Sequence, residues 1–160
     1  MSKVLIVYHS RGGNTRKLAE AIKSGVESVN GVEALLRNTK EVTKEEFLES
    51  SGVIAGSPVY FGTMAAELKK VFDDFVSTRK KMEGKIGAAF TTAGDVSGGK
   101  ETTMMSIIQA LFIYGMVITG DPMAATGHYG VSCVGEPDEK VIGYGKLLGQ
   151  RVAELSLKLL

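Results

Sequence analysis

The stretch Val7-Tyr8-His9-Ser10-Arg11-Gly12-Gly13-Asn14-Thr15, residues 7–15, decides how the rest of this chain can be organised. Residues 3–8 form a short apolar run rich in Val and Ile, which is typical of a buried strand. From Thr15 onward the apolar residues recur at helical spacing, so strand, loop and helix follow one another directly. The first amides of such a helix have no partners within it, and its dipole is positive at that end. The stretch therefore predicts a site for a phosphate group.

A well-capped turn without any ligand is the alternative interpretation of this loop. Two glycines, three short polar side chains and Arg11 favour a ligand, because Gly lets backbone amides approach closely. The loop is not the ATP-binding P-loop, since none of the three Gly-Lys pairs in the chain is followed by Ser or Thr. The dinucleotide fingerprint G-x-G-x-x-G is also missing: its nearest approach, Gly143-x-Gly145 with Gly149 beyond, falls within a helical pattern.

Length, charge and cysteine content restrict the class of protein. A chain of 160 residues is expected to form one domain spanning 1–160. The net charge of +1, with both signs mixed, gives no indication of a nucleic-acid partner. The single cysteine, Cys133, excludes an internal disulfide and a CxxC redox pair. No apolar run reaches about 18 residues, so we expect a soluble cytoplasmic protein without membrane insertion.

Five strands alternating with helices are predicted along the chain. The expected strands are 3–8, 32–36, 53–56, 85–91 and 116–119, the last with a second piece at 129–134. Helices are expected from Thr15, from Thr43 with a capping box to Glu46, from Met64, after Gly99, and from Pro137 at a first helical position. This alternation predicts an α/β fold, in which helices cover both faces of a parallel sheet. Ligands in such sheets bind outside the carboxyl ends of the strands, where three unusual loops should meet.

The second and third of these loops complement the first. The second, residues 57–63, combines a rigid Pro58, the adjacent rings of Tyr60 and Phe61, and Gly62, and this composition suits a flat, partly apolar ring. The third, residues 92–99, adds backbone donors and Asp95. A phosphate site and a ring site together describe a mononucleotide, and riboflavin phosphate (FMN) fits better than a dinucleotide because only one phosphate cradle is visible. The alternative for the two aromatic residues is packing within the core.

Motifs in all three loops resemble those of known flavoproteins. Ile6-Val7-Tyr8-x-Ser10-x-x-Gly13-x-Thr15-x-x-x-Ala19-x-x-Ile22 resembles the phosphate-loop signature of flavodoxins. The segment 56–62 is similar to the Gly-Thr-Pro-x-Arg-Phe-Gly of the flavoproteins named for Trp-repressor binding, which are NAD(P)H:quinone oxidoreductases. The segment 98–103 resembles their Gly-Gly-Gln-Glu run, and 114–118 resembles their His-Gly-Met-Val. The chain departs from them in having Tyr60 for Arg, Tyr114 for His, and a shorter segment at 77–84.

This resemblance implies a flavodoxin-like three-layer sandwich with a five-stranded parallel sheet of order 2-1-3-4-5. By position it implies FMN contacts in three loops and one later residue. These are Ser10, Arg11, Gly12, Gly13, Asn14 and Thr15 at the phosphate; Pro58, Val59, Tyr60, Phe61 and Gly62 at the ring; Thr92, Ala93, Gly94, Asp95, Val96 and Ser97 in the third loop; and Tyr114 nearby.

The function implied is an FMN-dependent oxidoreductase that takes electrons from NAD(P)H and reduces a quinone or a similar small-molecule acceptor. The flavin carries this chemistry, so no side chain is expected to act as catalytic acid or nucleophile, and no metal is expected. The alternative is a one-electron carrier that docks with redox-protein partners. Balanced charge, and the lack of an evident second stacking residue in the third loop, favour the enzyme. The resemblance also implies that copies of this chain associate into a dimer or a tetramer.

Other chemistries fit the sequence less well. A phosphorelay receiver needs acidic residues after the first and third strands, where His9-Ser10 and Ser57-Pro58 stand instead. A phosphatase of the phosphotyrosine type needs a Cys in the first loop. The sequence leaves open whether Asp95 tunes the flavin or is a solvated turn residue. It also leaves open whether His128, in the loop 120–130, approaches the ring or a neighbouring subunit.

Overall fold

A computed structural model describes residues 1–159 of the chain. Its strands are β1 (Ser2–Tyr8), β2 (Val32–Asn38), β3 (Gly52–Pro58), β4 (Ile86–Ala93), β5 (Val117–Ile118) and β6 (Gly130–Val134). Its helices are α1 (Asn14–Glu27), α2 (Lys44–Glu49), α3 (Ala66–Asp74), the 3-10 helix η1 (Val76–Lys81), α4 (Lys100–Ile113) and α5 (Glu139–Lys158). The strands form one parallel sheet of order β2-β1-β3-β4-β5, with β6 also paired to β4. The predicted fold class and strand order are confirmed.

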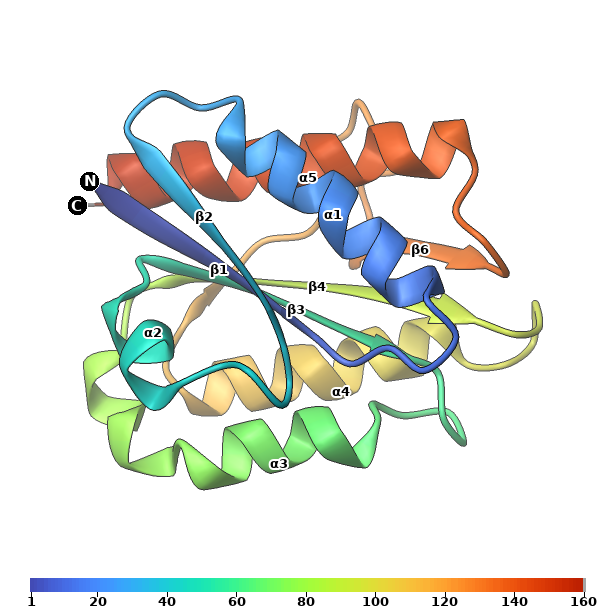
Figure 1. Cartoon of the computed structure of the whole chain (residues 1–160), viewed down its shortest axis with the longest axis horizontal. Coiled ribbons are helices and arrows are strands. Elements are labelled where there is room, and N and C mark those ends of the chain that lie inside the picture. Colours follow the sequence, from blue (N-terminus) through green and yellow to red (C-terminus); the bar gives the residue numbers. More distant parts are fainter. Residues whose placement is uncertain (160) are drawn as a thin grey trace.

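The molecule has three layers, with α1 and α5 on one face of the sheet and α2, α3 and α4 on the other (Figure 1). Alternate residues of β1 enter the two cores, because successive strand side chains point to opposite faces. Ile6 packs with Leu18 of α1 and Leu148 of α5, whereas Val7 packs with Phe47 of α2. Since β1 is buried on both faces, its sequence is a continuous apolar run and does not alternate.

Glycines bring α1 and α5 unusually close together. A Cβ at Gly25 would lie 1.9 Å from the carbonyl oxygen of Lys146, and a Cβ at Gly149 would lie 2.0 Å from that of Ile22. Gly145 likewise faces Leu18. Gly145 and Gly149, two of the three glycines that approach a dinucleotide fingerprint, therefore serve helix packing.

The fifth strand is split into two pieces, as the sequence predicts, and a buried carboxylate organises the segment between them. Asp121 is only 3% exposed. It accepts hydrogen bonds from the amides of Thr126, Gly127 and His128, at 2.8, 3.2 and 2.9 Å, and from the Thr126 hydroxyl at 2.6 Å. Burial alone would raise the pKa of the Asp121 carboxyl, but these donors hold it below its usual value.

Several predicted boundaries differ from the structure, and two of them concern residues named above. Strand β4 extends to Ala93, so Thr92 and Ala93 belong to the strand and not to the third loop, because pairing with β6 continues to that point. Pro137 does not open the last helix; Asp138 is its N-cap and accepts the Val141 amide at 2.8 Å.

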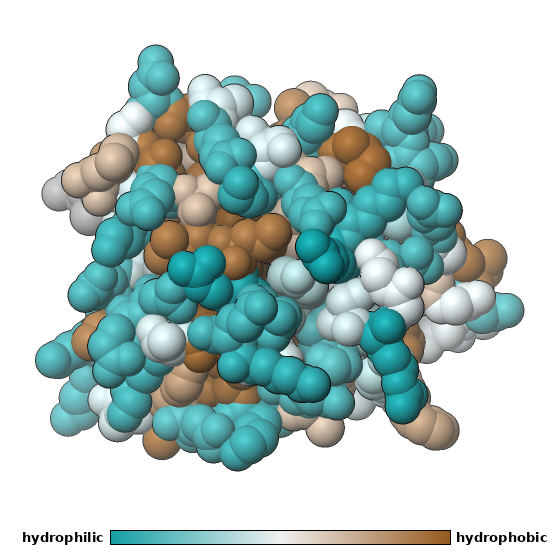
Figure 2. Space-filling model, viewed as in Figure 1, coloured by the Kyte–Doolittle hydropathy of each residue, from teal (hydrophilic) through white to brown (hydrophobic). Residues whose placement is uncertain are grey.

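Polar residues dominate the face shown in Figure 2, and apolar residues appear there as separate patches. At the end of that view where the carboxyl ends of the strands lie, the surface is paler, in keeping with the Gly, Ser and Thr of the loops. Within residues 1–159, no helix combines the length and the apolar character needed to cross a membrane.

Candidate cofactor-binding site

Three loops meet at the carboxyl edge of the sheet, after β1, β3 and β4 (Figure 1). They are residues 9–13, 59–65 and 94–99, which are far apart in the sequence. Parallel pairing of β1 with β3 and of β3 with β4 places the ends of these three strands side by side. The predicted convergence of the three loops is therefore observed.

The first loop ends in a helix start that lacks a side-chain cap. Gly13 is the N-cap of α1 with φ of 100°, a conformation that favours glycine. Its amide donates to the Ser10 hydroxyl at 3.1 Å. The first helical hydrogen bond runs from the Lys17 amide to the Gly13 carbonyl, at 2.9 Å. The amides of Asn14, Thr15 and Arg16 precede it, and no helical carbonyl serves them, so they are available to an anion.

Thr92, at the end of β4, ties the three loops together. Its hydroxyl lies 2.8 Å from the hydroxyl of Thr15, and the two residues are 5% and 2% exposed. Its carbonyl accepts the Val59 amide at 2.8 Å. Thr92 also lies one residue from the end of β4, where the third loop begins. Its side chain is engaged with Thr15 within the protein, so Thr92 holds the loops in position.

The second loop is a tight turn that presents an aromatic ring to solvent. Tyr60 and Thr63 exchange two backbone hydrogen bonds of 3.1 Å. The two residues between them, Phe61 and Gly62, have φ of 51° and 75°, as two-residue hairpin turns of type I′ require. The Thr102 hydroxyl donates to the Gly62 carbonyl at 2.6 Å and fixes the turn to α4. Phe61 is fully exposed, so it does not pack in the core.

Tyr60 lies inward of Phe61 and contacts His9. The ring centroids of His9 and Tyr60 are 6.2 Å apart in an edge-to-face arrangement. His9 Nε2 lies 3.7 Å from a carboxylate oxygen of Glu67, and its Nδ1 lies 3.5 Å from the Thr39 hydroxyl. His9 thus connects the first loop with the second and with the turn after β2.

The third loop contains a local turn around Asp95. The Asp95 carboxylate accepts the Ser97 amide at 2.9 Å, and its carbonyl accepts the Gly98 amide at 3.2 Å. The segment 94–97 is exposed. Asp95 is thus a residue of an exposed turn at this edge, and a role in tuning the flavin stays a prediction.

Comparison with known families finds one whose sequence pattern covers this edge of the sheet. Residues 2–130 match the family described as NADPH-dependent FMN reductase, and this span contains all three loops. The chain belongs to this family. The sequence-based prediction of a flavodoxin-like FMN redox protein is therefore confirmed.

Relatives of this FMN reductase family member include enzymes and flavodoxins. A protein of Aquifex aeolicus named flavodoxin is 38% identical over 96% of this chain and 86% of its own length. A protein of Archaeoglobus fulgidus named NAD(P)H dehydrogenase (quinone) is 33% identical over 99% of this chain and 100% of its own. The solved structure of a flavodoxin, WrbA-like protein from Agrobacterium tumefaciens has a TM-score of 0.84 at 22% identity, covers 99% of each chain, and shows the shared fold.

The residues present in this family member suit FMN. At one end of the edge stand the amides at the start of α1, which are neutral donors arranged for an anion. At the other end, an exposed aromatic ring stands on a turn held by Thr102. Gly99 allows the second loop to lie close against the start of α4, since a Cβ there would lie 2.9 Å from the Cα of Gly62. Close packing of these loops thus gives the cradle its shape.

Tyr114 does not lie at this edge of the chain, and its contact with FMN stays a prediction that the fold of a single chain does not support. It caps the far end of α4, a helix of 14 residues that begins beside the third loop. Its hydroxyl donates to the Phe72 carbonyl at 2.5 Å, and its ring packs on Phe47 at 5.2 Å between centroids. Burial raises the pKa of Tyr114 to about 12. The helix carries this residue about 20 Å away from the loops.

Two contributors to this edge are not predicted from the sequence. The turn after β2 joins the first loop, because the Thr39 amide donates to the Tyr8 carbonyl at 2.9 Å. Glu136, after β6, forms an ion pair of 2.6 Å with Lys17 of α1. The position of the turn after β2 could have been predicted from the strand order, because β2 lies parallel to β1 and ends at the same edge of the sheet.

Proposed function

We propose that this chain is an FMN-dependent oxidoreductase that accepts hydride from NAD(P)H and reduces a quinone or a similar small molecule. One observation carries the proposal: Thr92 ties a helix start with free amides and a turn with an exposed aromatic ring into a single cradle. Membership of the NADPH-dependent FMN reductase family supports it, as does the relative named NAD(P)H dehydrogenase (quinone).

We assign the FMN phosphate to the first loop, Ser10 to Thr15, where the amides of Asn14 and Thr15 and the charge of Arg11 favour a dianion. We assign the ring to the second and third loops, with Phe61 and Tyr60 on one side and the exposed segment 94–97 on the other. Pro58, Val59, Gly62 and Ala93 shape the backbone around it. Thr92 positions the first and second loops through its contacts with Thr15 and Val59.

When bound, FMN would supply the redox chemistry, the passage of a hydride equivalent (two electrons and one proton) from NAD(P)H to the quinone, and the second proton of the quinol would come from solvent. The residues of this chain bind and orient the cofactor and leave one side of it accessible to both substrates. The turn at 60–63 is suited to this role because Thr102 and the paired backbone bonds hold it rigid.

The visible spectrum of the purified protein tests the cofactor. We expect flavin absorption bands, or their recovery when the colourless protein is titrated with FMN. Steady-state oxidation of NADH or NADPH by the FMN-loaded protein, with a quinone present, then tests the activity. Turnover well above that of free FMN is expected, and absence of both flavin binding and turnover would refute the proposal.

A one-electron carrier between redox proteins is the second candidate, because the Aquifex aeolicus relative is named flavodoxin. Flavin binding without NAD(P)H turnover above that of free FMN would favour it. The net charge of +1 argues against it, because a strongly charged docking face is the usual means of steering a protein partner.

The remaining assignments follow from the proposed reaction. A donor of the NAD(P)H type implies a compartment that contains it, so we propose the cytoplasm. The acceptor is a small molecule or a redox protein. Assembly into a dimer or tetramer stays a prediction, which sedimentation of the FMN-loaded protein would test.

A further inference from the structure

A basic hollow lies beside the phosphate loop, between that loop and the turn after β2. It has a volume of about 300 Å³ and is lined by Tyr8, Ser10, Arg11, Arg16, Thr39 and Lys40, among others. It thus combines three cations with hydroxyl groups, and no carboxylate is found among its lining residues in the part of the chain that the structure describes. In a chain of net charge +1, this is a local concentration of positive charge.

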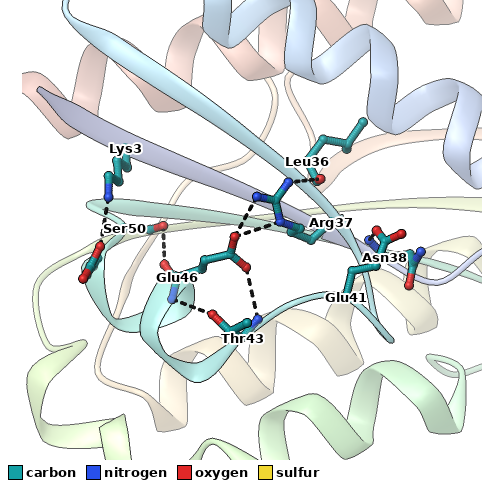
Figure 3. A network of polar contacts seen from close by, with 9 residues as sticks. Lys3, Leu36, Arg37, Asn38, Glu41, Thr43, Glu46 and Ser50 are labelled. Atoms are coloured by element: carbon teal, nitrogen blue, oxygen red, sulfur yellow. Dashed lines mark hydrogen bonds and ion pairs between the residues drawn. The ribbon is translucent and has the colours of Figure 1, made fainter.

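The far wall of this hollow is held in place by the protein itself. The side-chain oxygen of Asn38 accepts the Lys40 amide at 2.8 Å, and Glu41 accepts the Asn38 amide at 3.2 Å. Figure 3 shows this turn beside a second network, in which the Glu46 carboxylate accepts hydrogen bonds from the Arg37 side chain and the Thr43 amide. The backbone that carries Lys40 is therefore fixed by hydrogen bonds within the turn.

Lys40 and Arg16 are the cations of this hollow that are available to a second anion, because Arg11 is assigned to the FMN phosphate. Among residues 1–159, no carboxylate lies within 4 Å of the charged groups of Arg11 or Lys40. Arg16 pairs with Glu20 one turn along α1, at 2.9 Å, in an exposed contact of the kind that contributes little. Arg16 can therefore turn from Glu20 toward a phosphate dianion.

We propose that this hollow binds the 2′-phosphate of NADPH and gives the chain a preference for NADPH over NADH. The inference rests on the proposed function. In the sheet, β2 lies on the opposite side of β1 from β3, so the hollow lies across the phosphate loop from the ring-binding loops. A dinucleotide whose nicotinamide meets the flavin, and whose adenosine end extends past that loop, reaches the hollow. FMN has its phosphate met by the α1 amides, and NADH lacks the additional phosphate.

Steady-state kinetics of the FMN-loaded protein test the preference. We expect a higher kcat/KM for NADPH than for NADH in the natural chain. Lys40→Gln should lower kcat/KM for NADPH about tenfold, mostly through KM, since it removes one charge-assisted contact. The value for NADH should stay unchanged. Lys158→Gln, an exposed change of the same charge at the end of α5, is the matched control and should alter neither value.

Binding of 2′,5′-ADP measured by calorimetry, with 5′-AMP as the comparison, separates this inference from the proposed function. The natural chain should bind 2′,5′-ADP more tightly than 5′-AMP, and Lys40→Gln should remove the difference even if neither dinucleotide is oxidised. Equal affinity for the two nucleotides would overturn the inference. So would a Lys40→Gln variant in which FMN affinity falls and NADPH and NADH are affected equally, since the hollow would then serve the phosphate of FMN.

Discussion

At the scale of the residue, Phe61 combines two features that a stable fold does not favour. Its φ of 51° places a non-glycine residue in the left-handed region, which costs about 1–2 kcal/mol. Its ring is fully exposed, so no core packing offsets that cost. A strained residue with an exposed ring at the edge of a cradle is expected where ligand binding, and not folding, selects the side chain.

Phe61→Gly is therefore expected to raise stability and reduce affinity together. The free energy of unfolding of the FMN-free protein should rise by about 1 kcal/mol, because glycine adopts positive φ without strain. FMN affinity should fall at least about tenfold, since the ring contact is lost. Chemical denaturation and fluorescence titration measure the two effects. Phe61→Ala is the control, because it removes the ring but keeps the strain; an equal gain in stability there would contradict this explanation.

At the scale of the element, close packing of α1 on α5 sets the position of the phosphate loop. Gly25 and Gly149 let the two helix backbones approach to a distance at which no Cβ fits. The Lys17–Glu136 ion pair adds a contact between the start of α1 and the loop before α5. Helix α1 is thus held by its neighbour along its length, and its free amides keep a fixed position at the edge of the sheet.

Gly149→Ala should destabilise the protein strongly. The added methyl group would meet the Ile22 carbonyl at 2.0 Å, and the helices must separate. We expect a loss of about 3 kcal/mol or more, the upper range for overpacking. Gly143→Ala on the same helix is the matched control. A Cβ there meets no atom within 4 Å, so up to about 1 kcal/mol of stabilisation is expected from helix propensity. Thermal or urea unfolding gives both values, and similar effects from the two would contradict the packing argument.

The capping box of α2 makes stability depend on pH. Thr43 accepts the Glu46 amide at 3.1 Å, and Glu46 receives the Thr43 amide and the Arg37 side chain at 3.1 and 2.8 Å (Figure 3). Burial alone would raise the pKa of Glu46, but Arg37 and Thr43 hold it below its ordinary value of 4.5. A lowered folded-state pKa stabilises the protein above pH 4.5, and this contribution is lost as the pH falls through the folded value.

Glu46→Gln should consequently cost about 1 kcal/mol at pH 7 and less at pH 3, because the carboxyl of the natural chain loses its charge as the pH falls through its lowered folded-state pKa. Urea unfolding at the two pH values measures the difference. Glu45→Gln, at the exposed neighbouring position, makes the same change in charge and should have little effect at either pH. A cost for Glu46→Gln that does not change with pH would show that the ion pair is not its source.

At the scale of the whole molecule, the candidate site joins parts of the chain that lie more than 80 residues apart and are connected through β1, β3 and β4. A ligand that contacts all three loops binds only the folded state, and so it stabilises the fold as a unit. The phosphate and the ring of FMN contact different loops, which allows their contributions to be separated.

FMN should raise the unfolding temperature by about 5–10 °C at a free concentration of 100 times its dissociation constant, where the linkage gain is about 2.7 kcal/mol. Riboflavin, which lacks the phosphate, should produce a much smaller shift at the same concentration. Differential scanning calorimetry measures both. Equal shifts for the two compounds would show that the first loop does not hold the phosphate.

The sequence by itself determined the layered α/β fold, the capping box at Thr43 and the two-piece fifth strand. These depend on local periodicity and local hydrogen bonding, which neighbouring residues encode. It also indicated the three loops, because glycines, small polar residues and aromatics directly follow apolar runs. The family profile agrees with that interpretation, since it spans all three loops.

Only the tertiary structure decided how distant residues divide their roles. Thr92 is a buried link to Thr15, because pairing with β6 extends β4 beyond its apolar run. Tyr114 belongs to the core around Phe47, because a full helix carries it away from the loops. Lys40 lines the same hollow as Arg11 and Arg16, because β2 lies beside β1. Each of these contacts depends on strand pairing or helix length across the whole fold, and local sequence does not contain that information.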